Sequence, residues 1–259
     1  IRGDASMQDA LECGKVCQEL SIPCTIKKIY VPSSKLPGEG DESAARRLRL
    51  ESWAEIIDDP ENSVIALGHN SGDRIENLFI RLFRGSNSTG LTSMRPIQKL
   101  GRLTFARPLL NYSKNQIEYF LKNETQFSKW CIDSTNMDSK YQRNFIRNDI
   151  LPAIDAEIPY ALQGMLHSLR NLQEDAAALE GMASVLFEEL KATRAVSDTK
   201  FWLSIHNAVR SRLLRLFISD AIGSDFVPDS NLIERFNAEL AASNADPSSG
   251  EPVTIPLKD

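Results

Sequence analysis

The stretch SVIALGHNSGDRIEN, residues 63–77, decides the fold class of this chain. It begins with an apolar run, residues 63–68, of the kind that forms a buried parallel strand. Gly68 and Asn70 supply a turn residue and a helix cap, and the sequence predicts a helix over residues 71–84. A strand that leads directly into a helix is the unit from which α/β folds are built.

Helical and strand-like segments alternate on both sides of this unit. Apolar spacing predicts a helix over 4–20, β-branched alternation predicts a strand over 24–31, and strong helix formers predict a helix over 42–57. Residues 84–90 are predicted as a loop, and a further helix is expected to begin near Ser113, a suitable capping residue. The alternation predicts an α/β fold with a doubly wound parallel sheet.

The pattern changes after Pro152 and Pro159. Residues 160–222 are helical in pattern almost throughout, so the sequence predicts a second, all-α domain. The expected organisation is an α/β domain over 1–155, a helical domain over 156–241, and a linker with the start of a further domain over 242–259.

The amino-acid composition indicates where in the cell the protein works and which kinds of partner it can bind. The 259 residues are 42% hydrophobic with a net charge of −5, which argues against a uniformly basic nucleic-acid coat but not against a local basic patch. The cysteines form no CxxC pair and have no histidine at metal-ligand spacing, so neither a zinc site nor a disulfide framework is expected. No stretch approaches about 18 apolar residues, and a cytoplasmic protein that does not span a membrane is expected.

The turn after the central strand carries more functional groups than a turn requires. His69 follows the strand at the carboxyl edge of the sheet, where open α/β sheets bind their ligands. Asp73 and Glu76 are three residues apart and share one helix face. Together the three side chains can hold a divalent metal on a polyphosphate or bind an incoming amine. The alternative is that the two acids only complement the helix dipole.

Two further segments concentrate arginines. Arg46 lies on one side of the predicted helix 42–57, where a charged surface helix is the alternative interpretation. Arg143, Asn144 and Arg147 follow a predicted Asx-type turn, and both arginines share one helix face. Paired guanidinium groups suit phosphate oxygens, although an ion-paired surface is the alternative here as well.

Taken in order, these segments resemble one family. ESAARRLR (42–49), GHNSGDRIENLFIRLFRG (68–85) and YQRNFIRNDILP (141–152), with ARPLL and WCIDSTN between the last two, are similar to the motifs of tRNA(Ile)-lysidine synthetase, within the PP-loop ATP pyrophosphatase group. The resemblance extends from Ile1 to about Pro256 and is weaker over the helical stretch. The combination is specific, whereas no single motif would be.

The resemblance implies an enzyme that uses ATP and Mg²⁺. ATP would adenylate the C2 oxygen of the wobble cytidine in tRNA(Ile) with a CAU anticodon, and the ε-amine of L-lysine would then displace AMP to form lysidine. A carbonyl oxygen becomes a good leaving group once it carries a phosphoryl ester, and cationic groups stabilise the charge on the phosphates. The helical domain would bind tRNA, and the sequence leaves the oligomeric state open, a homodimer included.

The resemblance also implies roles for particular residues. The reaction centre would be lined by His69, Asp73, Glu76 and Arg46, with the two acids placing the lysine amine or holding Mg²⁺. The nucleotide would contact Gly68 and Arg46, and tRNA would contact Arg143, Asn144 and Arg147.

Some features depart from the family pattern. The Ser-Gly-Gly-x-Asp-Ser loop that cradles pyrophosphate does not occur, so the expectation is a truncated sequence that lacks the first β-α-β unit and binds ATP poorly. Asn77 and Leu50 stand where the family usually has Thr and Tyr. Two alternatives stay open: another PP-loop enzyme that thiolates cytidine, although the chain lacks the CxxC cysteines usual there, and a non-catalytic RNA-binding remnant.

Overall fold

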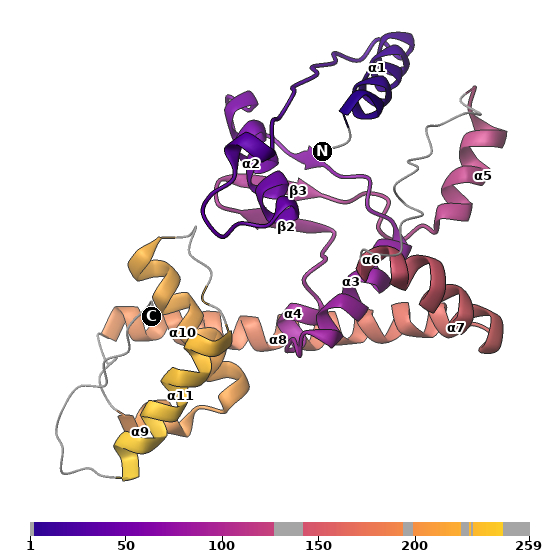
Figure 1. The fold of residues 1–259 in the computed structure, drawn as a ribbon. Coiled ribbons are helices and arrows are strands. Elements are labelled where there is room, and N and C mark those ends of the chain that lie inside the picture. Colours follow the sequence, from indigo (N-terminus) through magenta and orange to yellow (C-terminus); the bar gives the residue numbers. More distant parts are fainter. Residues whose placement is uncertain (1–2, 127–141, 194–198, 224–227, 229, 246–259) are drawn as a thin grey trace. The chain divides into compact units, whose positions relative to one another are not determined.

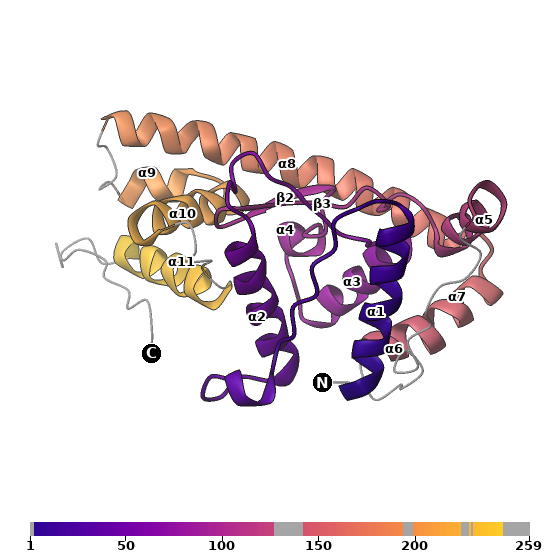
Figure 2. The same ribbon diagram turned by 90° about the horizontal axis from the view of Figure 1, so that it is seen from above.

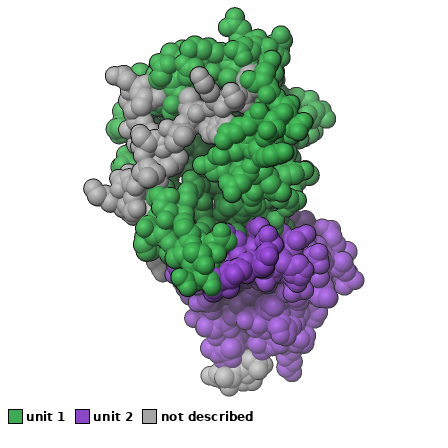
Figure 3. All heavy atoms as spheres, turned by 90° about the vertical axis from the view of Figure 1, so that its right-hand side faces the viewer, with its two compact units in different colours: residues 1–76, 95–157 green, residues 77–94, 158–259 purple. Residues whose placement is uncertain are grey.

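The computed structural model describes residues 3–126, 142–193, 199–223, 228 and 230–245. The chain forms two compact units, which Figure 3 distinguishes by colour. Unit 1 comprises Ile1–Glu76 and Arg95–Glu157, and unit 2 comprises Asn77–Met94 and Ile158–Asp259. The domain limits expected from the sequence stay a prediction.

Unit 1 combines helices with a small sheet (Figure 1). Its elements in chain order are α1 (Gly3–Glu19), η1 (Pro32–Ser34), α2 (Asp41–Ile56), β1 (Ile65–Ala66), the start of α3 (Ser71–Phe83), β2 (Ile97–Leu100), β3 (Leu103–Ala106), α5 (Lys114–Glu124), α6 (Gln142–Phe145), η3 (Ile146–Ile150) and α7 (Leu151–Glu157). The predicted helices at 4–20, 42–57 and 71–84 are thereby confirmed. The helix expected near Ser113 is confirmed too, with a capping box between Ser113 and Gln116.

The sheet in the described part of the chain has the order β1-β3-β2 and is mixed. β1 runs parallel to β3, with Ile65 opposite Phe105. β2 and β3 are antiparallel because a tight turn, with Gly101 at a φ of 55°, joins them directly. The expected parallel pairing therefore holds for β1 and β3 but is wrong for β2, and the combination of an α/β part with a helical part is correct.

Three local predictions fail for identifiable reasons. Residues 22–30 form no strand although their sequence alternates, since a strand also needs a neighbour and no described strand pairs with them. The run at 63–68 does contain the parallel strand β1, but it lies at the edge of the sheet, which leaves Val64 60% exposed instead of buried. The predicted loop 84–90 contains the start of α4 (Ser88–Leu91), where the side chain of Asn87 accepts a hydrogen bond from the Gly90 amide.

The sheet of unit 1 is covered on one face by α2. Trp53 of α2 packs against Phe105 of β3 with ring centroids 5.6 Å apart in a tilted geometry. Ile75 of α3 and Leu110, which follows β3, are also buried. This packing fixes the positions of α2, α3 and the residues that follow β3, on which the functional groups lie.

Unit 2 has no strand among its described residues and contains, after α4, the helices α8 (Ala161–Thr193), α9 (Thr199–Ser204), α10 (Asn207–Ile222) and α11 (Ser230–Ala245). α8 is the longest helix, with 33 residues, and Figure 2 shows its whole length. Phe217 of α10 packs edge to face against Phe187 of α8 and against Trp202 of α9. The helical character expected for residues 160–222 is correct for the part of it that is described.

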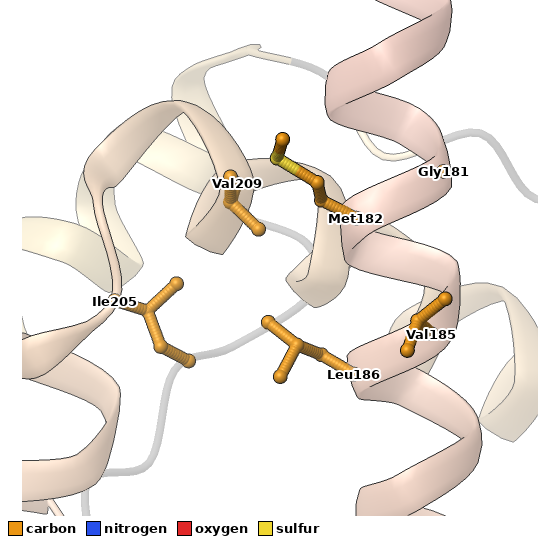
Figure 4. Close-up of a pocket in the computed structure, with 6 residues that line it drawn as sticks. All are labelled: Gly181, Met182, Val185, Leu186, Ile205 and Val209. Atoms are coloured by element: carbon orange, nitrogen blue, oxygen red, sulfur yellow. The ribbon is translucent and has the colours of Figure 1, made fainter.

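An open apolar pocket of about 530 Å³ lies in unit 2 between α8 and the start of α10 (Figure 4). It is lined by Gly181, Met182, Val185, Leu186, Ile205 and Val209, none of which carries a titratable or nucleophilic group. This pocket therefore offers an apolar surface and no catalytic group. No helix within the described ranges has the length and hydrophobicity needed to cross a membrane.

Candidate functional site

The candidate site begins at the carboxyl edge of the sheet in unit 1. β1 and β3 are parallel, so the residues that follow them emerge at the same edge. The amide of Leu67 donates to the carbonyl of Ala106 over 2.8 Å, which extends the pairing one residue beyond β1. Arg107 follows β3 directly, and His69 lies three residues past the end of β1.

A reciprocal cap fixes the start of α3. The side-chain oxygen of Asn70 accepts hydrogen bonds from the amides of Gly72, at 2.8 Å, and Asp73, at 3.3 Å. In return, the Asn70 amide donates to Asp73 Oδ2 over 2.8 Å. This is a capping box, in which side-chain oxygens satisfy three backbone amides at the helix start. The cap occupies one carboxylate oxygen of Asp73 and directs the other toward the site.

Two carboxylates and two guanidinium groups form a dense ion-pair cluster, which we call the Asp73–Glu76 cluster. Asp73 and Glu76 are only 8% and 2% exposed, whereas the side chains of their arginine partners are 41% and 37% exposed. Arg143 donates to Asp73 Oδ1 over 2.6 Å and to Glu76 Oε2 over 2.7 Å. Arg147 donates to Glu76 Oε1 over 2.6 Å, to Glu76 Oε2 over 2.9 Å and to Asp73 Oδ1 over 3.2 Å. The cluster is formally neutral, and the carboxylate of Glu76 raises the pKa of Arg147.

The arginines reach the cluster through a helix of irregular pitch. α6 passes into a π-helical turn, η3, in which the Leu151 amide donates to the carbonyl of Ile146 five residues earlier. Pro152 follows and has no amide hydrogen to continue the ladder. Ile146 is fully buried and anchors this turn, so the arginines on either side of it project together toward α3.

The cluster leaves no carboxylate oxygen free for a metal ion. Each of the four oxygen atoms of Asp73 and Glu76 already accepts at least one hydrogen bond. Mg²⁺ prefers oxygen ligands in an octahedral arrangement, and guanidinium groups occupy that space here. Nor do the described residues gather three metal-binding side chains anywhere. A magnesium ion at Asp73 and Glu76 does not fit the cluster in this arrangement.

His69 lies beside the cluster in a half-buried position. Burial lowers the pKa of its imidazole, and Arg107, Arg143 and Arg46 lower it too, while Asp73 acts in the opposite direction. Its Nδ1 atom is buried without a hydrogen-bond partner among the residues that the structure describes. At neutral pH the imidazole is therefore uncharged and keeps a ring nitrogen available for a proton or a ligand.

The lowered pKa of His69 predicts a loss of stability in acid. The unfolded chain binds a proton near pH 6.5 and the folded chain does so only at lower pH, so the free energy of unfolding falls as the pH drops through that range. We expect His69→Gln to reduce this slope in urea titrations between about pH 5.5 and 7.5. His167→Gln, at an exposed histidine of α8, is the matched control and should retain it. An unchanged slope in His69→Gln would show that the imidazole titrates normally.

The other residues expected in the site, Arg46, Gly68 and Asn144, are not part of the Asp73–Glu76 cluster. Arg46 is exposed on α2 and forms no ion pair with a described residue, whereas the neighbouring Arg47 binds Glu39 and Glu51. The bond from Arg47 lowers the pKa of Glu39 to about 2. Gly68 is exposed at the strand end, and Asn144 is half-buried on α6.

One candidate residue was not singled out from the sequence. Arg107 follows β3 directly, and its guanidinium donates to the carbonyl of Arg95 over 2.8 Å and to Gln98 Oε1 over 3.1 Å. Its place in the ARPLL motif could have identified it from the sequence, but the strand that it directly follows was not predicted. Only the parallel pairing with β1 places it at the same edge as His69.

Comparison with known sequences shows the family to which the chain belongs. A family model described as a PP-loop domain matches residues 1–154, which is more than half of the chain. The chain belongs to the PP-loop family. The resemblance that the motifs indicated is thereby confirmed.

Three relatives of this PP-loop chain are tRNA(Ile)-lysidine synthases. The protein from Clostridioides difficile is 30% identical over 254 residues, which are 96% of this chain and 53% of that protein. The protein from Actinobacillus pleuropneumoniae serotype 3 is 33% identical over 210 residues, or 80% and 48% of the two chains. The protein from Chromobacterium violaceum is 31% identical over 243 residues, or 92% and 53%. The chain thus spans about half the length of the curated relatives it matches.

Proposed function

We propose that this PP-loop chain is the catalytic part of an enzyme that attaches L-lysine to the wobble cytidine of tRNA(Ile) with a CAU anticodon, using ATP. The observation that carries the proposal is the buried carboxylate pair of Asp73 and Glu76 at the carboxyl edge of the sheet, already bound to two cationic side chains. A site that holds guanidinium groups by ionic hydrogen bonds is suited to a substrate ammonium group. Membership of the PP-loop family supports the use of ATP.

The arginines and the substrate amine would compete for the same oxygen atoms. Lysine approaches the site as a cation, and Asp73 Oδ1 and Glu76 Oε2 each accept two hydrogen bonds from guanidinium groups. Binding of lysine therefore requires one arginine to move or to share its acceptor. In this proposal the two acids position the amine of lysine. While lysine is absent, the two arginines neutralise the charge of the acids.

The second step needs an acceptor for a proton. The ε-amine attacks C2 of the cytidine, the C2–N bond forms, the C2–O bond breaks, and AMP departs with the oxygen. The ammonium group must give up a proton before its nitrogen can attack, and His69, whose pKa is lowered by burial, is suited to accept that proton. Arg46, which no described carboxylate neutralises, is suited to the phosphate of the adenylate.

RNA would bind to the exposed side of the Asp73–Glu76 cluster. Arg143 and Arg147 keep 41% and 37% of their side chains exposed while they are paired, so part of each guanidinium remains available to RNA phosphates. Asn144 lies between them on α6. We propose that these three residues contact tRNA. An enzyme that acts on tRNA would be located in the cytoplasm. Mg²⁺ would have to be bound with the ATP phosphates and away from the paired acids.

The proposal is tested by following both steps with α-³²P-labelled ATP and the full-length protein. With a tRNA(Ile) transcript and no lysine, the label should become attached to the RNA as an adenylate. Addition of L-lysine should then release labelled AMP, while L-ornithine, whose chain is shorter, should release it more slowly. A transcript with uridine at the wobble position is the control and should not be labelled. Labelled RNA that lysine fails to discharge would contradict lysine ligation.

A further inference from the structure

We propose that Arg107, together with Arg46, binds a phosphate group at the carboxyl edge of the sheet. The inference rests on the proposed function, since it names a further residue for the phosphate chemistry of the same site. The phosphate belongs either to the nucleotide or to the RNA backbone, and the anion is the same in both cases. Four features of unit 1 lead to Arg107.

The first feature is its position. The register of the parallel strands pairs Ala66 with Ala106, so Arg107 is the first residue past the sheet on β3. Its backbone amide donates to the carbonyl of Pro96 over 2.8 Å, which fixes the main chain at this point. Ligands of α/β sheets bind outside the carboxyl ends of the strands, where this side chain starts.

The second feature is the lack of a counter-charge. The Arg107 guanidinium donates to two neutral acceptors, the carbonyl of Arg95 and the amide oxygen of Gln98. Within the described ranges neither Arg107 nor Arg46 has a carboxylate partner. By contrast, Arg143 and Arg147 in the same unit are each paired with two carboxylates. A guanidinium that is partly withdrawn from water without a counter-charge is costly, so an anion would stabilise Arg107.

The third feature is an unused donor. The Nε atom of Arg107 is buried and has no acceptor among the described residues. Buried donors almost always have partners, and one without a partner calls for an explanation. A phosphate oxygen would accept from this N–H group with the additional strength of an ionic hydrogen bond.

The fourth feature is the surrounding charge. Burial lowers the pKa of Arg107, and the charge of Arg46 lowers it further, so the two guanidinium groups are close enough to repel. The same two arginines lower the pKa of His69. An anion placed among these groups would relieve the repulsion and leave the neutral Asp73–Glu76 cluster undisturbed. The site therefore has separate places for a cation and for an anion.

The test measures the binding of AMP, and separately of an anticodon stem-loop RNA, to the full-length protein. We expect Arg107→Gln to weaken one of the two by about tenfold or more, because an ionic hydrogen bond is lost. Arg107→Lys should recover part of that affinity by restoring the charge. Arg102→Gln, at an exposed arginine in the β2–β3 turn, is the matched control and should bind both probes as the unchanged protein does.

The two probes separate the sources of the phosphate. If only AMP binding becomes weaker, Arg107 binds the phosphate of the nucleotide. If only RNA binding becomes weaker, Arg107 binds a phosphate of the RNA backbone. Unchanged affinity for both probes, with only a lower melting temperature, would overturn the proposal and leave Arg107 as a link between β2 and β3. Weakened binding in a protein that never transfers lysine would instead contradict the proposed function and leave the phosphate site in place.

Discussion

Replacing Asp73 by asparagine in the full-length protein is expected to slow the discharge of adenylated tRNA by lysine by about 100-fold. The amide keeps an oxygen that can accept the Asn70 amide and so preserves the cap of α3. It loses the negative charge that holds a cation at the site, at a cost of about 3 kcal/mol. Formation of the adenylate should change much less, because the phosphates are assigned to Arg46 and Arg107. Single-turnover release of labelled AMP from the adenylated tRNA measures the effect.

Asp41→Asn is the matched control for this variant. Asp41 is also an acid in the first turn of a helix, but its side chain is 70% exposed, and its ion-pair partner in the described structure is Lys35. We expect this control to discharge the adenylate at the normal rate. Discharge at the normal rate by a folded Asp73→Asn protein would remove Asp73 from the site and leave it as a helix cap.

The double variant Arg143→Gln/Arg147→Gln is expected to lower the free energy of unfolding by about 3 kcal/mol at neutral pH. It leaves the carboxylates of Asp73 and Glu76 buried and without cationic partners. The expected loss is at the low end of the usual range because the arginine side chains are 41% and 37% exposed, so water can partly replace them. Urea denaturation at neutral pH, followed by circular dichroism, measures this loss.

A pair of exposed arginines provides the control for the stability measurement. Arg49 of α2 and Arg102 of the β2–β3 turn are exposed and have no ion pair within the described part of the chain. Arg49→Gln/Arg102→Gln removes the same formal charge and should change the free energy of unfolding by less than about 0.5 kcal/mol. Equal effects in the two double variants would mean that net charge, and not the Asp73–Glu76 cluster, determines the loss.

Local sequence predicts those parts of the site that are formed by neighbouring residues. The turn at Gly68 and Asn70, the cap of α3 and the shared face of Asp73 and Glu76 all follow from spacings of a few residues. The pairing of Arg143 with Asp73 joins residues 70 positions apart, and no periodicity encodes such a contact. The family resemblance brought both segments into one site, but only the structure pairs them.

The errors in the sheet have the same physical origin. Alternation at residues 24–31 indicates a strand, yet strand formation depends on a distant partner that the segment does not have in the described structure. Conversely, β2 and β3 were not predicted because each has only four residues. Without β3, the position of Arg107 beside His69 could not be inferred. The helices were predicted well because their hydrogen bonds are local.

The most direct test of lysine ligation is the mass of the modified nucleoside. Full-length protein, ATP, L-lysine and a tRNA(Ile) transcript with a CAU anticodon are incubated, and the RNA is digested to nucleosides for mass spectrometry. The predicted result is a nucleoside with the mass of cytidine plus lysine less one water, which appears only when lysine and ATP are both present and is absent with Asp73→Asn. Unmodified cytidine at the wobble position, or a thiolated cytidine in its place, would contradict the account.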